Sequence, residues 1–138
     1  METVLAAARL VQDDVPIAAA IVGDEGIVSL SVNETYSSNN PIGHAEIVAI
    51  QEAGKVLGTS RLDGYSLFTN LEPCTMCAGA IRTSRLSRLV FGARNSQDGA
   101  CGSVTDAVRQ GSHQVEVIPG VLEKESAALL LDFFHSRR

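Results

Sequence analysis

The chain contains no tryptophan, and it has only three cysteines and four prolines. Three cysteines, two of them spaced as Cys74 and Cys77, make a poor disulfide framework, so metal binding in a reducing compartment is the better first interpretation. The chain also lacks a long apolar run and a basic leader. Its most apolar early stretch, residues 15–23, is far too short to cross a bilayer. We therefore expect a soluble, cytoplasmic protein with no membrane partner.

The length and the hydrophobic content predict one domain over residues 1–138. A chain of 138 residues with 45% hydrophobic content can bury a core without disulfide bonds. We find no internal repeat, low-complexity tract or linker. Glycine and proline are spread evenly along the chain, which indicates short connections within one fold.

The charge distribution bears on nucleic acid binding. A net charge of −5 argues at first sight against a polyanionic partner. However, residues 1–72 carry three basic and ten acidic side chains, whereas residues 73–109 carry five basic and two acidic ones. The basic group follows the cysteine pair and consists of Arg82, Arg85, Arg88, Arg94 and Arg109. These arginines fit a surface for a polyanion and an ordinary solvated helix face about equally well.

Hydrophobic periodicity predicts an α/β order of elements. Helices are expected over residues 3–12, 45–58, 74–82 and 122–136, and strands over residues 17–23, 27–32, 66–70, 88–91 and 115–118. The first two strands form a hairpin, which must be antiparallel. The later strands are separated by helices and need crossover connections. The expected fold is therefore a three-layer α/β/α domain with a five-stranded mixed sheet.

Two short motifs carry side chains suited to a metal. His44 lies at the start of one predicted helix, and Pro73, Cys74 and Cys77 lie at the start of another. Cysteines three residues apart in a first helical turn share one face, and the helix N-terminus favours the thiolate form that zinc requires. Proline suits this position because a helix entrance needs no amide hydrogen there. The spacing predicts a zinc site with His44, Cys74 and Cys77 as ligands.

The number of ligands distinguishes a catalytic zinc from a structural one. A structural zinc normally has four protein ligands, whereas a catalytic zinc has three and keeps one position for water. Glu46 stands two residues beyond the histidine and points elsewhere on the helix, so we assign it general acid and base work. Zinc lowers the pKa of its water from about 15.7 to near 7, which supplies a nucleophile at neutral pH. In the alternative, Cys101 is a fourth ligand and the chain is a zinc-stabilised binding module.

The combination His-x-Glu followed by Pro-Cys-x-x-Cys is the signature of zinc-dependent nucleobase deaminases. Over nearly its whole length the sequence also resembles the bacterial tRNA-specific adenosine deaminases of the cytidine/deoxycytidylate deaminase superfamily. The resemblance runs through VPIAAAIV, HAEIVAI, LEPCTMCAGAI, SRLSRLVFGAR, GACGS and GVLEKESAALLLDFF.

This resemblance implies a cytidine-deaminase-like fold and hydrolytic deamination of adenosine to inosine at the wobble position of a tRNA anticodon loop. The implied partner is the anticodon stem-loop of an arginine tRNA. The resemblance further implies one Zn²⁺ per subunit on the three predicted ligands, with Glu46 as the proton shuttle. It assigns substrate contacts to Asn33, Ala45 and Pro73, and it implies a homodimer whose interface helps to build the anticodon cleft.

Other interpretations remain open from the sequence. A free nucleobase or nucleoside deaminase, acting on cytosine, guanine or a related compound, would use the same chemistry without a basic rim. Without the resemblance, Asn33 would be only a turn residue. Glu34 and Asn95 depart from the residues that the tRNA enzymes commonly carry. Phe133 and Phe134 are most simply core or interface anchors, with base stacking as the alternative.

Overall fold

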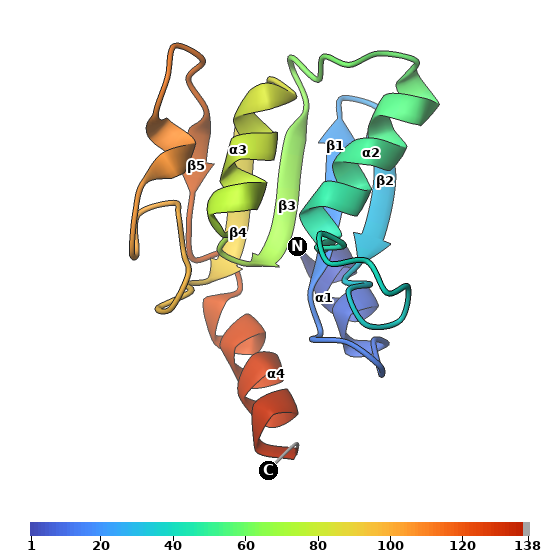
Figure 1. Cartoon of the computed structure of the whole chain (residues 1–138), viewed down its shortest axis with the longest axis vertical. Coiled ribbons are helices and arrows are strands. Elements are labelled where there is room, and N and C mark those ends of the chain that lie inside the picture. The colour runs from blue at the N-terminus through green and yellow to red at the C-terminus, as the bar shows by residue number, and fades with distance from the viewer. Residues whose placement is uncertain (137–138) are drawn as a thin grey trace.

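A five-stranded mixed sheet forms the centre of the computed structural model, which describes residues 1–136 (Figure 1). The strands, in the spatial order β2-β1-β3-β4-β5, are β1 (Ala18–Gly23), β2 (Gly26–Val32), β3 (Ser66–Leu71), β4 (Arg88–Ala93) and β5 (Glu116–Ile118). Strands β3, β4 and β5 are parallel, and β1 is antiparallel to both of its neighbours. The five-stranded mixed sheet that the sequence predicts is confirmed.

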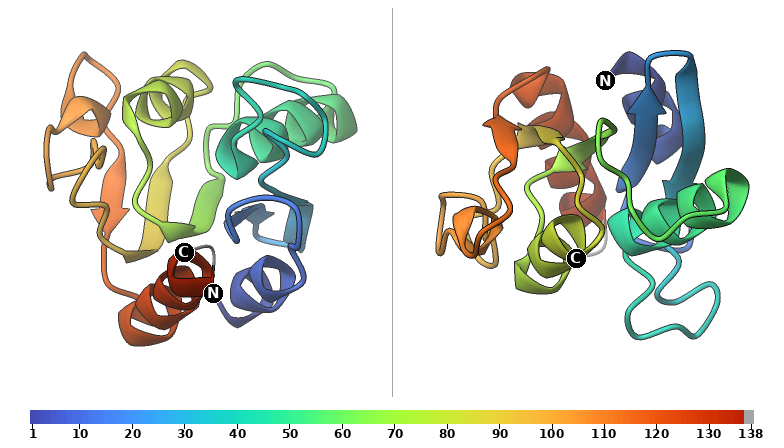
Figure 2. Two further views of the ribbon diagram at one scale, coloured as in Figure 1. Left: turned by 60° about the horizontal axis from the view of Figure 1, so that its bottom comes forward. Right: turned by 90° about the horizontal axis from the view of Figure 1, so that it is seen from above.

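Within residues 1–136, four α-helices cover the two faces of this sheet. Helices α1 (Glu2–Arg9) and α4 (Glu123–Ser136) lie on one face, and α2 (Ala45–Leu57) and α3 (Thr75–Thr83) lie on the other (Figure 2). A short 3₁₀ helix, η1 (Ala107–Arg109), precedes β5. The predicted three layers are confirmed, although α1 ends at Arg9 and not at residue 12.

Successive side chains of β1 point to opposite faces of the sheet, and helices cover both faces, so the strand is apolar throughout. Ala18 and Ala20 pack with Val4 of α1, whereas Ala19 and Ile21 belong to the larger core between the sheet and helices α2 and α3. All four of these strand residues are buried, because a central strand covered on both faces has no side that meets solvent. Complete burial of a side chain such as Ile21 contributes about 1.5–3 kcal/mol. The alanines let the helices approach the strand closely.

The structure tests the core interpretation of Phe133 and Phe134, the aromatic pair of α4. The ring centroids of Phe133 and Phe134 are 5.2 Å apart in an edge-to-face contact. Phe134 is 54% exposed, so the core interpretation is wrong for this residue, and its role as an interface anchor stays a prediction. Among the helices of residues 1–136, none has the length and apolar character needed to cross a membrane.

The strand directions place two helix starts at one edge of the sheet. Strands β2 and β3 point the same way, because each is antiparallel to β1. Helix α2 follows β2 and helix α3 follows β3, so both helices begin beside the carboxyl ends of these strands (Figure 1). In open α/β sheets this edge is where ligands usually bind. Both predicted metal motifs lie there.

Candidate active site

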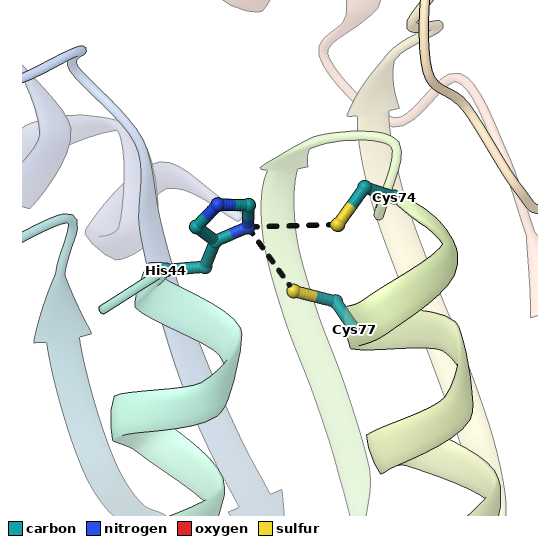
Figure 3. Close-up of side chains that lie close together, drawn as sticks. All are labelled: His44, Cys74 and Cys77. Carbon is teal, nitrogen blue, oxygen red and sulfur yellow. Dashed lines mark hydrogen bonds between the residues drawn. The ribbon is translucent and has the colours of Figure 1, made fainter. Parts of the chain in front are cut away.

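Three side chains from two helix starts converge at this edge. His44 precedes the first residue of α2, and Cys74 precedes the first residue of α3, with Cys77 in the first turn of α3. The His44 Nδ1 lies 3.5 Å from the Cys74 Sγ and 3.4 Å from the Cys77 Sγ (Figure 3). The three ligand atoms all lie within 4.8 Å of one another.

These separations fit a single zinc ion. Typical zinc–sulfur and zinc–nitrogen bonds of about 2.3 and 2.0 Å, set at a tetrahedral angle, place nitrogen and sulfur about 3.5 Å apart. Two sulfurs and one imidazole nitrogen are also the donor types that zinc prefers. Within residues 1–136 the cluster contains His44, Cys74 and Cys77 but not Cys101. The fourth-ligand alternative for Cys101 is therefore wrong, and the protein ligands number three.

The protonation states of the two cysteines bear on metal binding. A hydrogen bond from the Cys77 thiol, together with one from His44, lowers the pKa of Cys74 to about 4, so this sulfur is a thiolate at neutral pH. The hydrogen bond to Cys74 raises the pKa of Cys77, and burial is the second cause of this rise. The bond to Cys74 also raises the pKa of His44. Metal binding has to displace the proton of Cys77, so it is coupled to proton release.

Glu46 is buried beside the three ligands. Its side chain belongs to the first turn of α2, two residues beyond His44, and the residue is only 5% exposed. Burial raises the pKa of Glu46 above the usual range, while the nearby His44 acts in the opposite direction. A carboxyl group whose pKa is raised by burial is suited to accept a proton and to release it again.

The structure brings the three predicted substrate-binding residues to the same edge. Asn33 follows β2 and is 8% exposed, and its Oδ1 accepts a hydrogen bond of 3.3 Å from the backbone N–H of Ala45. Ala45 is the first residue of α2 and is fully buried. Pro73 directly precedes Cys74, and its carbonyl accepts a hydrogen bond from the N–H of Ala100.

A cavity of about 260 Å³ opens over His44, Cys74 and Glu46. It is lined by Val15, Ile17, Asn33, Thr35, Tyr36, His44, Glu46, Leu71, Cys74, Asn95 and Asp98. A groove of about 580 Å³ along α4 shares Val15, Leu71, Asn95 and Asp98 with this cavity and reaches Phe134. The metal pocket therefore continues into a longer surface groove.

The charged residues singled out from the sequence lie in different places. Glu34 lines a separate hollow beside α1 and not the metal pocket. Arg85 and Arg88 pair with Asp63 and Glu116 near the start of β4, at the opposite edge of the sheet. These two arginines do not face the metal pocket.

Two buried carboxylates were not assigned any role from the sequence. Asp14 accepts the N–H groups of Tyr36 and Ser37 at 3.0 Å each. Glu72 accepts hydrogen bonds from the loop that follows β4. A signal for Glu72 is present in the sequence, because an acidic residue between the end of an apolar strand and Pro73 is unusual unless the fold satisfies it.

The fold and the site define the class as a zinc-dependent deaminase. The zinc-binding region model of the cytidine and deoxycytidylate deaminases matches residues 1–93. A tRNA-specific adenosine deaminase of Bacillus subtilis (strain 168) is 41% identical over 127 residues, which cover 91% of this chain and 79% of the relative. One of Agrobacterium fabrum is 41% identical over 142 residues, covering 100% of this chain and 93% of the relative.

Solved structures agree with this result. A structure from a study of A-to-I editing by tRNA deaminases at the wobble position matches with a TM-score of 0.90 and 41% identity, covering 94% of this chain and 97% of that one. A guanine deaminase from Nitrosomonas europaea matches with a TM-score of 0.76 and 29% identity, covering 96% and 79%. This chain belongs to the cytidine and deoxycytidylate deaminase family and, within it, to the tRNA-specific adenosine deaminases.

Proposed function

We propose that this protein converts adenosine to inosine at the wobble position of a tRNA anticodon loop. The observation that carries this proposal is the three-ligand zinc site with Glu46 buried beside it, in a pocket that opens into a longer groove. A zinc ion held by His44, Cys74 and Cys77, the three ligands found within residues 1–136, would lower the pKa of water and so would supply a nucleophile at neutral pH.

Glu46 is the group that moves protons. In the proposed reaction its carboxylate accepts the proton of the attacking water and delivers it to a ring nitrogen of adenine as the carbon–oxygen bond forms. Glu46 then takes the proton of the newly formed hydroxyl group and delivers it to the exocyclic amine. Ammonia leaves as the carbon–nitrogen bond breaks, and the hydroxyl oxygen becomes the carbonyl of the product. The burial that raises the pKa of Glu46 suits both directions of transfer.

Asn33, Ala45 and Pro73 are proposed to hold the base. The Asn33 carboxamide lines the pocket. Its Oδ1 already accepts a hydrogen bond from the backbone N–H of Ala45. The amide nitrogen is therefore the group that can donate a hydrogen bond to a ring nitrogen of the base. The backbone of Ala45 and of Pro73 borders the two ligand-bearing turns. The target base would then meet polar groups from both sides of the metal.

The groove along α4 favours a polynucleotide over a single base. It is larger than the metal pocket and shares four lining residues with it, so nucleotides on one side of the target base have a surface to occupy. The exposed Phe134 ring borders this groove and is available for stacking. We further propose an arginine tRNA as the partner of a cytoplasmic homodimer of single-domain subunits.

A guanine or other free-base deaminase is the second candidate, and the match to the Nitrosomonas europaea guanine deaminase favours it. The deciding experiment incubates the zinc-loaded protein with an arginine tRNA anticodon stem-loop and, separately, with guanine, cytosine and their nucleosides. Inosine at the wobble position, with no free-base turnover, supports the proposal. Turnover of a free base without inosine in RNA contradicts it.

A further inference from the structure

The carboxylate of Glu72 is the anchor of the loop that follows β4. Glu72 is 1% exposed, and it accepts backbone hydrogen bonds from Asn95 at 3.1 Å, Cys101 at 3.0 Å and Ser103 at 3.1 Å. The Ser103 hydroxyl donates a fourth. Both carboxylate oxygens are used, and the donors are spread over nine residues of chain. No ion pair accompanies these bonds among residues 1–136, so the loop itself satisfies the charge.

The loop fits closely against this carboxylate. A Cβ at Gly99 would lie 2.6 Å from the Glu72 carboxyl group and 2.5 Å from the carbonyl oxygen of Asn95. Neither contact can relax easily, because four donors hold the carboxyl group and the Asn95 oxygen belongs to the backbone. The N–H of Ala100 also donates to the carbonyl of Pro73 at 2.9 Å. The loop is therefore attached to two successive residues, immediately before a metal ligand.

This attachment places one wall of the substrate pocket. Asn95 and Asp98 line the metal pocket and the groove along α4. The Asn95 Oδ1 accepts the N–H groups of Gln97 and Asp98, which keeps the turn that carries Asp98 compact. The opposite end of the loop is held at Cys101 and Ser103. Without Glu72, both ends of this wall would lose their fixed point.

We propose that Glu72 is a positioning residue for the base pocket, which holds the loop of residues 95–103 against the Pro73–Cys74 turn without touching substrate or metal. The proposal rests on the proposed function in assigning the loop to substrate binding. The attachment itself does not depend on activity. Glu72 thus affects how tightly the target base and its neighbouring nucleotides are bound, and so KM. It affects kcat, the turnover rate of the enzyme–substrate complex, less.

The test is Glu72→Gln in the zinc-loaded protein. The amide keeps the size of the side chain but turns one acceptor oxygen into a donor. Its nitrogen then opposes the backbone N–H groups of Cys101 and Ser103 if it takes the place of Oε2, or that of Asn95 if it takes the place of Oε1. Hydrogen exchange should become at least about tenfold faster at the Asn95 amide or at the Cys101 and Ser103 amides, as expected from the loss of charged hydrogen bonds. KM for the anticodon stem-loop should rise about tenfold, with kcat changed much less, and zinc content should stay at the wild-type level.

Three further variants separate positioning from general destabilisation. Leu62→Val removes a methylene from a fully buried side chain before β3, near the start of that strand, and should lower stability without changing loop exchange or KM. Ser103→Ala removes one donor and should give a smaller effect of the same kind. Gly99→Ala keeps Glu72 but displaces the loop, and should also raise KM.

Unchanged exchange at all three of Asn95, Cys101 and Ser103 in Glu72→Gln would overturn the proposal. A KM shift that Leu62→Val reproduces would also overturn it. Loss of zinc in Glu72→Gln would also overturn it, because Glu72 would then act through Cys74. If the wild-type protein forms no inosine in RNA, the proposed function fails, while the exchange measurement still decides whether Glu72 holds the loop.

Discussion

The Oδ1 of Asn33 accepts a hydrogen bond of 3.3 Å from the backbone N–H of Ala45. This contact connects the end of β2 to the first turn of α2, which carries the histidine ligand and the buried glutamate. The N–H of Ala45 is one of the amides that a helix cannot satisfy internally. One asparagine therefore fixes the helix start with its oxygen, and the same residue lines the metal pocket.

Substitution of Asn33 should separate these two tasks. Asn33→Ala loses both, so we expect a loss of about 1 kcal/mol in the free energy of unfolding and a large rise in KM. Asn33→Asp keeps an oxygen acceptor for Ala45 but loses the donor nitrogen, so its substrate binding should fall with less loss of helix anchoring. Urea unfolding and steady-state deamination of the stem-loop measure the two effects. An active Asn33→Ala protein would contradict the substrate role.

Glu46→Gln should leave a folded, zinc-loaded and inactive protein. The amide preserves shape but cannot accept a proton, so turnover should fall by about two to four orders of magnitude. Zinc stoichiometry by atomic absorption should remain near that of the wild type, because Glu46 is not a member of the ligand cluster. Retained turnover would assign the proton transfers to another group.

The two kinds of cysteine should respond differently to serine. Cys77→Ser removes one of three ligands and should release zinc and abolish deamination. Cys101 is buried with its thiol near the Pro73 carbonyl, and burial raises its pKa to about 12, so it remains a neutral thiol. Cys101→Ser should retain zinc and activity. Zinc loss from Cys101→Ser would instead support a closed, four-ligand site.

Asp14 should contribute to the acid stability of the fold. Burial acts to raise its pKa, but hydrogen bonds from Tyr36 and Ser37 hold it below the ordinary value of 3.8. Its folded pKa is therefore lower than its unfolded pKa. The resulting stabilisation is present above about pH 4 and is lost as the pH falls through the folded value.

Asp14→Asn tests this dependence. The amide can serve only one of the two backbone donors, so at pH 7 the free energy of unfolding should fall by about 1–3 kcal/mol. The difference from the wild type should shrink as the pH is lowered below about 4, where the wild-type carboxylate begins to take up its proton. Denaturant unfolding across this range measures it. A difference that does not depend on pH would show that the charge of Asp14 is unimportant.

Hydrophobic periodicity predicted which segments are helices and which are strands. It predicted the residues at which these elements begin and end less well. The apolar run of β1 and the glycine that ends α2 are local features, so the sequence shows them directly. The early end of α1 and the 3₁₀ helix η1 depend on packing and were not predicted. The antiparallel pairing of β1 with β3 follows from the position of the hairpin within the sheet, which no local pattern encodes.

The sequence by itself determined the metal chemistry. The histidine, the glutamate and the two cysteines stand at helix starts, and their roles follow from side-chain type and from spacing within one turn. Only the tertiary structure decided that Cys101 lies outside the ligand cluster, that Arg85 and Arg88 lie at the far edge, and that Glu72 holds a loop. Each of these depends on contacts between residues far apart in the chain, and such contacts are set by the packing of the whole fold and not by neighbouring residues.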